Sequence, residues 1–328
     1  MRLMCAGLVA VFALSNDSLA AETVALLSDY GPGSTTPALC HGALAAGLTD
    51  VRVLDLSHGV PVGDTETGAV MLRRIAALPV HTVVIGLVGD GAVPPPQLVA
   101  FQTSRGFYCI GPNDGLFGWV VKQQGVFRVV EIDPAMVMPG FQGDGTDTWK
   151  LLTAAAVRFC NNGRDLLTLG PGIADSDLIT GDVSECSASR GTGDVKGVVL
   201  RDLADGRSDR DGGDGVASPN HRGAPYLSSG VLTNVSTGAV RLAGLRLDED
   251  LELELGQGDH ARTIELDHVA RGADPRSTRD SSGAKGDRLA FAVFEDLVVF
   301  YPEPGSDLDD RLMAGETILV RRVRRSGP

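Results

Sequence analysis

Two loops of this 328-residue chain place a carboxylate close to glycine soon after a short apolar run. In Ser28-Asp29-Tyr30-Gly31-Pro32-Gly33, the Asp29 carboxylate can accept hydrogen bonds from the two hydroxyls of a ribose, and the glycines let a ligand approach the backbone. The same loop also fits a strand-to-helix turn capped by aspartate. In Gly89-Asp90-Gly91, Asp90 either faces the same rim of a sheet or is an ordinary turn residue. The loops predict a polar site where strands end.

A third polar loop, Gly143-Asp144-Gly145-Thr146-Asp147-Thr148-Trp149, opens a long helical segment. Backbone N–H groups at a helix start favour a carboxylate or another anion, although Asp144 and Asp147 taken alone fit simple capping best. His58 also follows a strand, but a single histidine is more often structural than catalytic. The sequence has no G-x-S-x-G elbow, Walker loop, strand-following G-x-G-x-x-G or H-E-x-x-H. Hydrolase triads, nucleotide triphosphatases, dehydrogenases and zinc peptidases therefore have no motif in their favour.

Short apolar strands alternate with helical segments from Glu22 to about Gly163, which is typical of an α/β domain with a mostly parallel sheet covered on both faces. Ligands of such sheets bind at the carboxyl ends of the strands. The predicted strands are Thr23–Leu27, Val51–Leu56, Thr82–Val88, Leu98–Gln102, Phe107–Ile110 and Phe127–Ile132, and the predicted helices are Pro37–Leu48, Asp64–Leu78 (with Asp64 as N-cap), Gly115–Gln124 and Thr146–Phe159.

After about Gly191 the pattern contains strands and no convincing helix, which predicts an all-β C-terminal domain. The predicted strands are Val195–Asp202, Leu251–Leu255, Thr263–Leu266, Leu289–Tyr301 and Thr317–Val323. A polar insertion rich in Asp, Gly, Ser and Arg spans 203–228. We therefore expect an α/β domain over 21–190 and a β-rich domain over 191–328.

Charge and the N-terminal residues bear on partners and location. The net charge of −13 disfavours nucleic acid and membrane surfaces as partners. Arg2, the apolar run Leu3–Leu14 and the small residues ending at Ala20 predict a signal peptide over 1–20 and a periplasmic or secreted protein.

Export would leave four cysteines where disulfides are permitted, and their spacing is not that of a zinc site. Of these, Cys160 and Cys186 are the preferred pair for a disulfide, with free buried thiols as the alternative; the other two are Cys40 and Cys109.

Five short motifs follow one another between about Val24 and Val235. Taken in this order they resemble the S-adenosylmethionine (SAM) hydroxide adenosyltransferases and their fluorinase and chlorinase relatives. The motifs are Ser28-Asp29-Tyr30-Gly31 with His41-Gly42, Asp55-Leu56-Ser57-His58-Gly59-Val60-Pro61, Gly111-Pro112-Asn113-Asp114-Gly115-Leu116, Asp202, and Gly230-Val231-Leu232-Thr233-Asn234.

The resemblance implies SAM as a substrate with no cofactor or metal, displacement at the ribose C5′ carbon, and a homotrimer that binds SAM between neighbouring subunits. On the matching positions, Asp29 would hold the ribose hydroxyls and Asp202 would contact the methionine portion. The family's Val-Val-Asp-Pro-Gly-Val-Gly is here Leu87-Val88-Gly89-Asp90-Gly91-Ala92-Val93, and its His-Gly-Arg-Asp is Asp144-Gly145-Thr146-Asp147. Two hypotheses follow: a SAM hydrolase with Asp90 or Asp144 as general base, or a non-catalytic exported nucleoside-binding or interaction protein.

Overall fold

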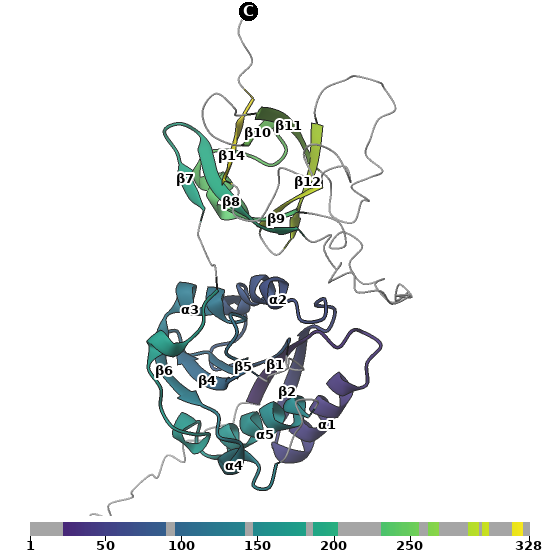
Figure 1. Ribbon diagram of the computed structural model, residues 1–328, viewed down its shortest axis with the longest axis vertical. Coiled ribbons are helices and arrows are strands. Elements are labelled where there is room, and N and C mark those ends of the chain that lie inside the picture. Colours follow the sequence, from purple (N-terminus) through teal and green to yellow (C-terminus); the bar gives the residue numbers. More distant parts are fainter. Residues whose placement is uncertain are drawn as a thin grey trace, which may run out of the picture.

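The N-terminal half of the chain forms one six-stranded, mostly parallel sheet in the order β2-β1-β3-β5-β4-β6, as expected (Figure 1). The computed structural model describes residues 22–89, 96–141, 147–181, 186–202, 231–255, 262–268, 288–294, 297–301 and 317–323. Strand β1 is parallel to β2 and β3, β3 is parallel to β5, and β4 is antiparallel to both β5 and β6. The strands are β1 (Glu22–Ser28), β2 (Val51–Ser57), β3 (Val83–Leu87), β4 (Leu98–Thr103), β5 (Tyr108–Pro112) and β6 (Val126–Glu131).

Helices cover both faces of this sheet, because its central strands are apolar on both sides. One core lies under α1 (Thr36–Gly47), α4 (Pro134–Val137) and α5 (Thr148–Asn161). The opposite core lies under α2 (Thr65–Leu72) and α3 (Gly118–Gln124). Asp64 caps α2 as predicted, since its side chain accepts the N–H of Thr67 at 3.0 Å. The described residues of the domain also form three short 3-10 turns: Ile75–Ala77, Leu166–Thr168 and Asp175–Asp177.

The strand order of the first sheet has a switch point between β1 and β3. From β1, the chain adds β2 on one side and β3 on the other, so the connections leave in opposite directions between β1 and β3. In open α/β sheets such a switch point leaves a binding crevice at the carboxyl ends of the strands. Here that edge carries the residues that follow β1, β2, β3 and β5.

The C-terminal strands form a second sheet that closes on itself, because β14 pairs with both β10 and β8. Its strands pair antiparallel except for β11 with β12. Figure 1 shows this barrel beyond the α2 and α3 end of the first domain. The strands are β7 (Ser187–Ser189), β8 (Asp194–Asp202), β9 (Val231–Ser236), β10 (Leu251–Leu255), β11 (Arg262–His268), β12 (Arg288–Phe294), β13 (Leu297–Tyr301) and β14 (Thr317–Arg322).

Two details of this domain differ from expectation. The expected strand Leu289–Tyr301 is two antiparallel strands, β12 and β13. The expectation of no helix is wrong, because α6 (Thr237–Leu242) follows β9 directly. Its cap is local: the Ser236 side chain accepts the N–H of Ala239 at 3.0 Å.

The two domains meet through a small apolar cluster. Val70 of α2 packs with Leu232, Leu297, Val299 and Tyr301 from β9 and β13 of the barrel. Val70 is 1% exposed, so α2 is anchored to the second domain. Among the described residues, none of the helices combines the length and apolar character needed to cross a bilayer.

The four described cysteines are free, so the preferred Cys160–Cys186 disulfide is not formed. Cys160 lies in α5 of the first domain, where burial, and to a smaller extent the charge of Glu22, raise the pKa of its thiol to about 12. Cys186 lies against the other domain, with the Ser236 N–H 3.5 Å from its sulfur. The two cysteines pack against different hydrophobic cores, so they are not brought together although they are close in the sequence.

Candidate functional site

Asp29 lies at the end of β1, at the switch point, with its carboxylate held by backbone groups. Its Oδ2 accepts the N–H of Gly63 at 2.8 Å and the N–H of Gly89 at 3.0 Å. These donors come from the loop after β2 and from the end of β3, so one oxygen joins three strand ends. The residue is 6% exposed. The described residues give Oδ1 no hydrogen-bond partner, which leaves that oxygen to accept from a ligand hydroxyl.

Asp114 brings a second carboxylate to the same edge, in the turn after β5. Its Oδ1 accepts the Leu116 N–H at 3.0 Å and its Oδ2 accepts the Thr65 hydroxyl at 3.1 Å. Burial raises the pKa of the Asp114 carboxyl above its ordinary value, although these hydrogen bonds act in the opposite direction. A half-buried carboxyl of this kind is a better proton acceptor than an exposed one.

Asn113, the neighbour of Asp114, is a structural clamp. Its amide donates to Gln97 Oε1 and to the Asp177 carbonyl, each at 2.9 Å, and its Oδ1 accepts the Ile179 N–H at 2.7 Å. The clamp ties the turn after β5 to the segment after the last 3-10 turn. Asp114 is therefore presented from a fixed turn rather than from a free loop.

A network of hydrogen bonds and ion contacts joins the ends of β1 and β2 to α1. His41 Nε2 lies 2.7 Å from Asp55 Oδ1, and His58 Nε2 lies 3.0 Å from the same oxygen in a direction that makes a poor hydrogen bond. Ser28 Oγ lies 2.8 Å from His58 Nδ1. Partial burial raises the pKa of Asp55, and the hydrogen bond with His41 and the contact with His58 lower it by more. Ser28 is fully buried, which excludes it as a nucleophile despite the Ser-His-Asp connection.

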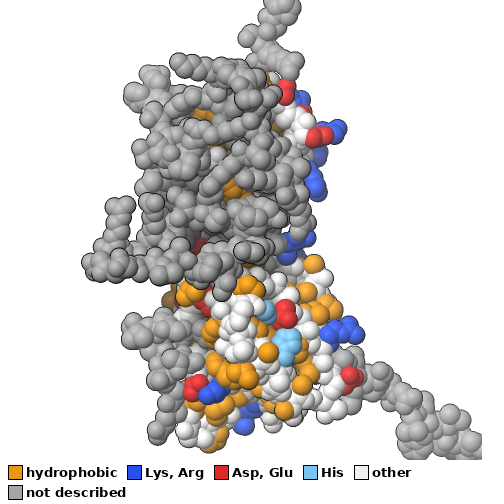
Figure 2. All heavy atoms as spheres, turned by 90° about the vertical axis from the view of Figure 1, so that its right-hand side faces the viewer, with side chains coloured by type: hydrophobic (Ala, Val, Ile, Leu, Met, Phe, Trp, Pro, Cys, Tyr) orange, Lys and Arg blue, Asp and Glu red, His pale blue; other side chains and the backbone are white. Residues whose placement is uncertain are grey.

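The network of His41, Asp55 and His58 borders a cavity of about 320 Å³ formed by the loop after β1 and the start of α1. Figure 2 shows histidine side chains beside a carboxylate on one face of the N-terminal domain. His41, Asp55 and His58 line the cavity, together with Gly31, Pro32, Ser34, Pro37 and Ala38. In the part of the chain that the structure describes, no group of three His, Cys, Asp or Glu side chains has a geometry suited to a metal ion.

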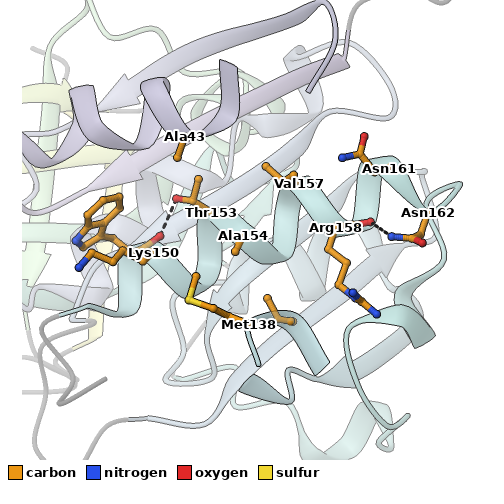
Figure 3. A pocket seen from close by; sticks show the side chains of 11 residues that line it. Ala43, Met138, Lys150, Thr153, Ala154, Val157, Arg158, Asn161 and Asn162 are labelled. Carbon is orange, nitrogen blue, oxygen red and sulfur yellow. Dashed lines mark hydrogen bonds between the residues drawn. The ribbon is translucent and has the colours of Figure 1, made fainter. Parts of the chain in front are cut away.

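A larger hollow of about 520 Å³ lies along α5, between that helix, α1 and α4 (Figure 3). Met138, Ala154 and Val157 line it with Ala43, and Thr153 turns its hydroxyl back to the Trp149 carbonyl at 2.7 Å. Its lining contains no carboxylate and no residue from a strand end. The chemistry-bearing groups therefore gather at the carboxyl edge of the sheet and not in the larger hollow.

The sequence-predicted residues have different outcomes. Asp29 lies at the expected edge, whereas Asp90 and Asp144 fall outside the described residues. Asp202 ends β8, where its backbone pairs with Val231, and its side chain is not described. In the sequence, Asp114 belongs to one of the five motifs but was not a candidate site residue, although a carboxylate close to glycine after an apolar strand is the same signal that pointed to Asp29.

Comparison with known proteins finds similarity over the first domain. Residues 24–163 match the SAM hydroxide adenosyltransferase N-terminal domain. The chain is 28% identical over 152 residues to (R)-S-adenosyl-L-methionine hydrolase of Methanocaldococcus jannaschii, which covers 44% of this chain and 56% of the relative. It is 31% identical over 93 residues to the protein of the same name from Salinispora arenicola, which covers 28% of this chain and 35% of the relative. The chain thus spans about half, or less, of the length of these curated relatives.

Two solved structures share the fold over most of the chain. An uncharacterized conserved protein from Thermotoga maritima aligns with 91% of this chain and all of its own, with a TM-score of 0.56 and 15% identity. A conserved hypothetical protein from Thermus thermophilus aligns with 92% of this chain and all of its own, with a TM-score of 0.55 and 19% identity. Over its N-terminal domain, this chain is therefore similar to the SAM hydroxide adenosyltransferase family.

Proposed function

We propose that this protein binds SAM at the carboxyl edge of the first sheet and hydrolyses it to adenosine and methionine. The relatives named (R)-S-adenosyl-L-methionine hydrolase support this reaction class. The carboxylate of Asp29 at the edge favours a substrate that carries a positive charge.

The reaction needs little from an acid. Water attacks the ribose C5′ carbon, the C5′–S bond breaks with its electron pair on sulfur, and methionine leaves as a neutral thioether. One water proton must pass to a base and then to solvent, so the positive charge of the sulfonium ends as a released proton. The protein has to hold the ribose, align the water opposite the C–S bond and accept that proton.

The observation that carries the proposal is the fixed geometry of Asp29. Its Oδ2 is occupied by two backbone donors, which holds the carboxylate in one orientation. The remaining oxygen has no hydrogen-bond partner among the described residues and would accept a ribose hydroxyl, as the family resemblance implies for this position. A carboxylate held in this way loses little freedom when a ligand binds.

The direct test is calorimetric titration of the protein from Ala21 onward with SAM and with adenosine, followed by chromatography of the same mixture. Wild type is expected to bind SAM and to release adenosine and methionine, and Asp29→Asn to bind at least tenfold more weakly. Asp165→Asn is the control, because that exposed carboxylate also accepts a backbone N–H, from Leu167 at 3.0 Å, at a turn outside the edge. Absence of adenosine after prolonged incubation would reject the hydrolase.

A second candidate is an exported protein that binds a nucleoside without turning it over. It is favoured by Gly89, which stands in the segment where the family places an aspartate and has a positive φ of 69°. Binding of adenosine or SAM with no product would establish this candidate in the titration above.

Three further expectations belong to this proposal. A signal peptide over 1–20 predicts a mature N-terminus at Ala21, which mass spectrometry of exported protein tests. Asp202 is proposed to contact the methionine portion, so Asp202→Ala should weaken SAM binding more than adenosine binding. A homotrimer is proposed because the family builds its site between subunits, and sedimentation of the purified protein tests it.

A further inference from the structure

Gly89 is the meeting point of the two carboxylates at the sheet edge. Its N–H lies 3.0 Å from Asp29 Oδ2. A Cβ atom built on Gly89 would lie 3.4 Å from Asp114 Oδ2 and 3.6 Å from the Thr65 hydroxyl. The direction in which a side chain at position 89 would leave the backbone is therefore already bordered by the Asp114 carboxylate. This matters because Gly89 stands in the segment where the family resemblance expects an aspartate.

The strand order explains how a carboxylate after β5 can take the place of one at the end of β3. Strands β3 and β5 are parallel neighbours, so their carboxyl ends open on the same edge. A carboxylate missing from the end of β3 can be supplied from the turn after β5 without any change in topology. The positive φ of Gly89 and the clamp made by Asn113 fix the two sides of that arrangement.

We propose that Asp114 is the general base of this protein: its carboxylate accepts the proton of the water that attacks C5′, in place of the aspartate absent at Gly89. This inference rests on the proposed SAM hydrolysis. The water O–H bond breaks toward an Asp114 oxygen, the oxygen–C5′ bond forms, and the C5′–S electron pair stays on sulfur. The protonated carboxyl then releases its proton to solvent.

The surroundings of Asp114 suit this role. Thr65 donates to Oδ2 at 3.1 Å, which orients the carboxylate and leaves that oxygen able to accept one more hydrogen bond. Asp29 is less suited to this role, because its Oδ2 is already occupied by the N–H groups of Gly63 and Gly89 and its Oδ1 is assigned to the ribose. Asp114 is partly exposed, so water can reach it, and burial raises its pKa, which makes the carboxylate a stronger base.

The test compares Asp114→Asn with wild type and with Asp133→Asn as a matched control. Asp133 follows β6 and accepts the Ala135 N–H at 2.9 Å, the same i to i+2 contact that Asp114 makes, but lies outside the site. An asparagine at 114 can still accept from Leu116 and donate to the Thr65 hydroxyl, so the turn is retained. We expect Asp114→Asn to bind SAM within threefold of wild type and to lose about 100-fold or more in turnover. We expect Asp133→Asn to match wild type in both.

Four results would overturn the assignment. Turnover by Asp114→Asn within threefold of wild type would remove Asp114 from the chemistry and leave the hydrolase standing. Loss of both SAM binding and turnover in Asp114→Asn would make Asp114 a structural or binding residue. Loss of turnover in Asp90→Asn, with Asp114→Asn still active, would assign the general base to Asp90. Wild type that binds SAM without releasing adenosine would reject the hydrolase and this assignment together.

Discussion

Removing the Asp29 carboxylate should destabilise the N-terminal domain by an amount that can be worked from its two hydrogen bonds. In Asp29→Ala, the N–H groups of Gly63 and Gly89 lose an acceptor that now lies at 2.8 and 3.0 Å. A hydrogen bond to a charged group contributes about 1.5–3 kcal/mol. Gly63 is exposed and its N–H can turn to water, whereas Gly89 is half-buried and keeps most of the loss. The expected cost is therefore roughly 2–4 kcal/mol, and not the full sum of two such bonds.

Asp29→Asn separates the geometry from the charge. An amide oxygen can accept both backbone N–H groups, so only the charge-assisted part is lost and the expected cost is about 1 kcal/mol. For a domain of this size, 1 kcal/mol shifts Tm by about 2–4 °C. We expect Tm to fall by roughly 4–16 °C in Asp29→Ala and by about 2–4 °C in Asp29→Asn.

Thermal and urea unfolding of the two variants, followed by circular dichroism, measure these costs, with Asp165→Asn as the control for a capping carboxylate. If Asp29→Ala unfolds within about 0.5 kcal/mol of wild type, the carboxylate does not hold the three strand ends together. The preorganised site argued from it would then be wrong, whatever the variant does to SAM binding.

Four further predictions concern single residues. Gly197→Ala should destabilise the barrel by about 1–3 kcal/mol in urea unfolding, because its Cβ would lie 2.6 Å from the Asn234 oxygen that accepts the Val198 N–H; an unchanged midpoint would contradict this. The pKa of Asp55 is lowered in the folded protein, so wild type should have a higher Tm than Asp55→Asn above pH 3.8. This difference in Tm should disappear as the pH falls through the lowered pKa of the folded state. Asp114 has a raised pKa, so Asp114→Asn should be more stable than wild type at pH 7, and this gain should vanish below pH 3.8 in urea titrations. Cys160 should react slowly with a disulfide reagent at pH 8 in native protein and rapidly in urea, and fast native labelling of that residue by mass spectrometry would refute its burial.

The elements that sequence reasoning placed well are those with local signals. All six strands of the first sheet were expected within two residues of their observed bounds, because each is a short apolar run closed by glycine, proline or polar residues. Strand β9 and helix α6 were missed for different reasons. Strand β9 owes its place to pairing with the distant β8 and β13, whereas the Ser236 cap of α6 was readable in the sequence.

The candidate site shows the same division. Asp29 could be predicted from its own loop, since a carboxylate and glycines after a strand are a local pattern. Asp114 could not be brought to Gly89 by any local pattern, because their approach depends on β5 lying beside β3, with β4 placed beyond it. The predicted Cys160–Cys186 disulfide was wrong for the same reason, because the two cysteines pack against the hydrophobic cores of different domains.

The closure of the barrel by β14 also sets an order of assembly. Thr317 of β14 pairs with Val198 of β8, more than a hundred residues earlier, whereas β1, β2 and β3 pair with one another within the first ninety residues. During synthesis the first sheet can therefore form while the barrel still lacks the strand that joins its two ends. Until β14 arrives, β8 and β10 present unpaired edges, and contacts between such distant segments form slowly. The period before closure is when this chain is most exposed to aggregation, so a chaperone or a rapid docking of β9 and β13 onto Val70 would have its largest effect there.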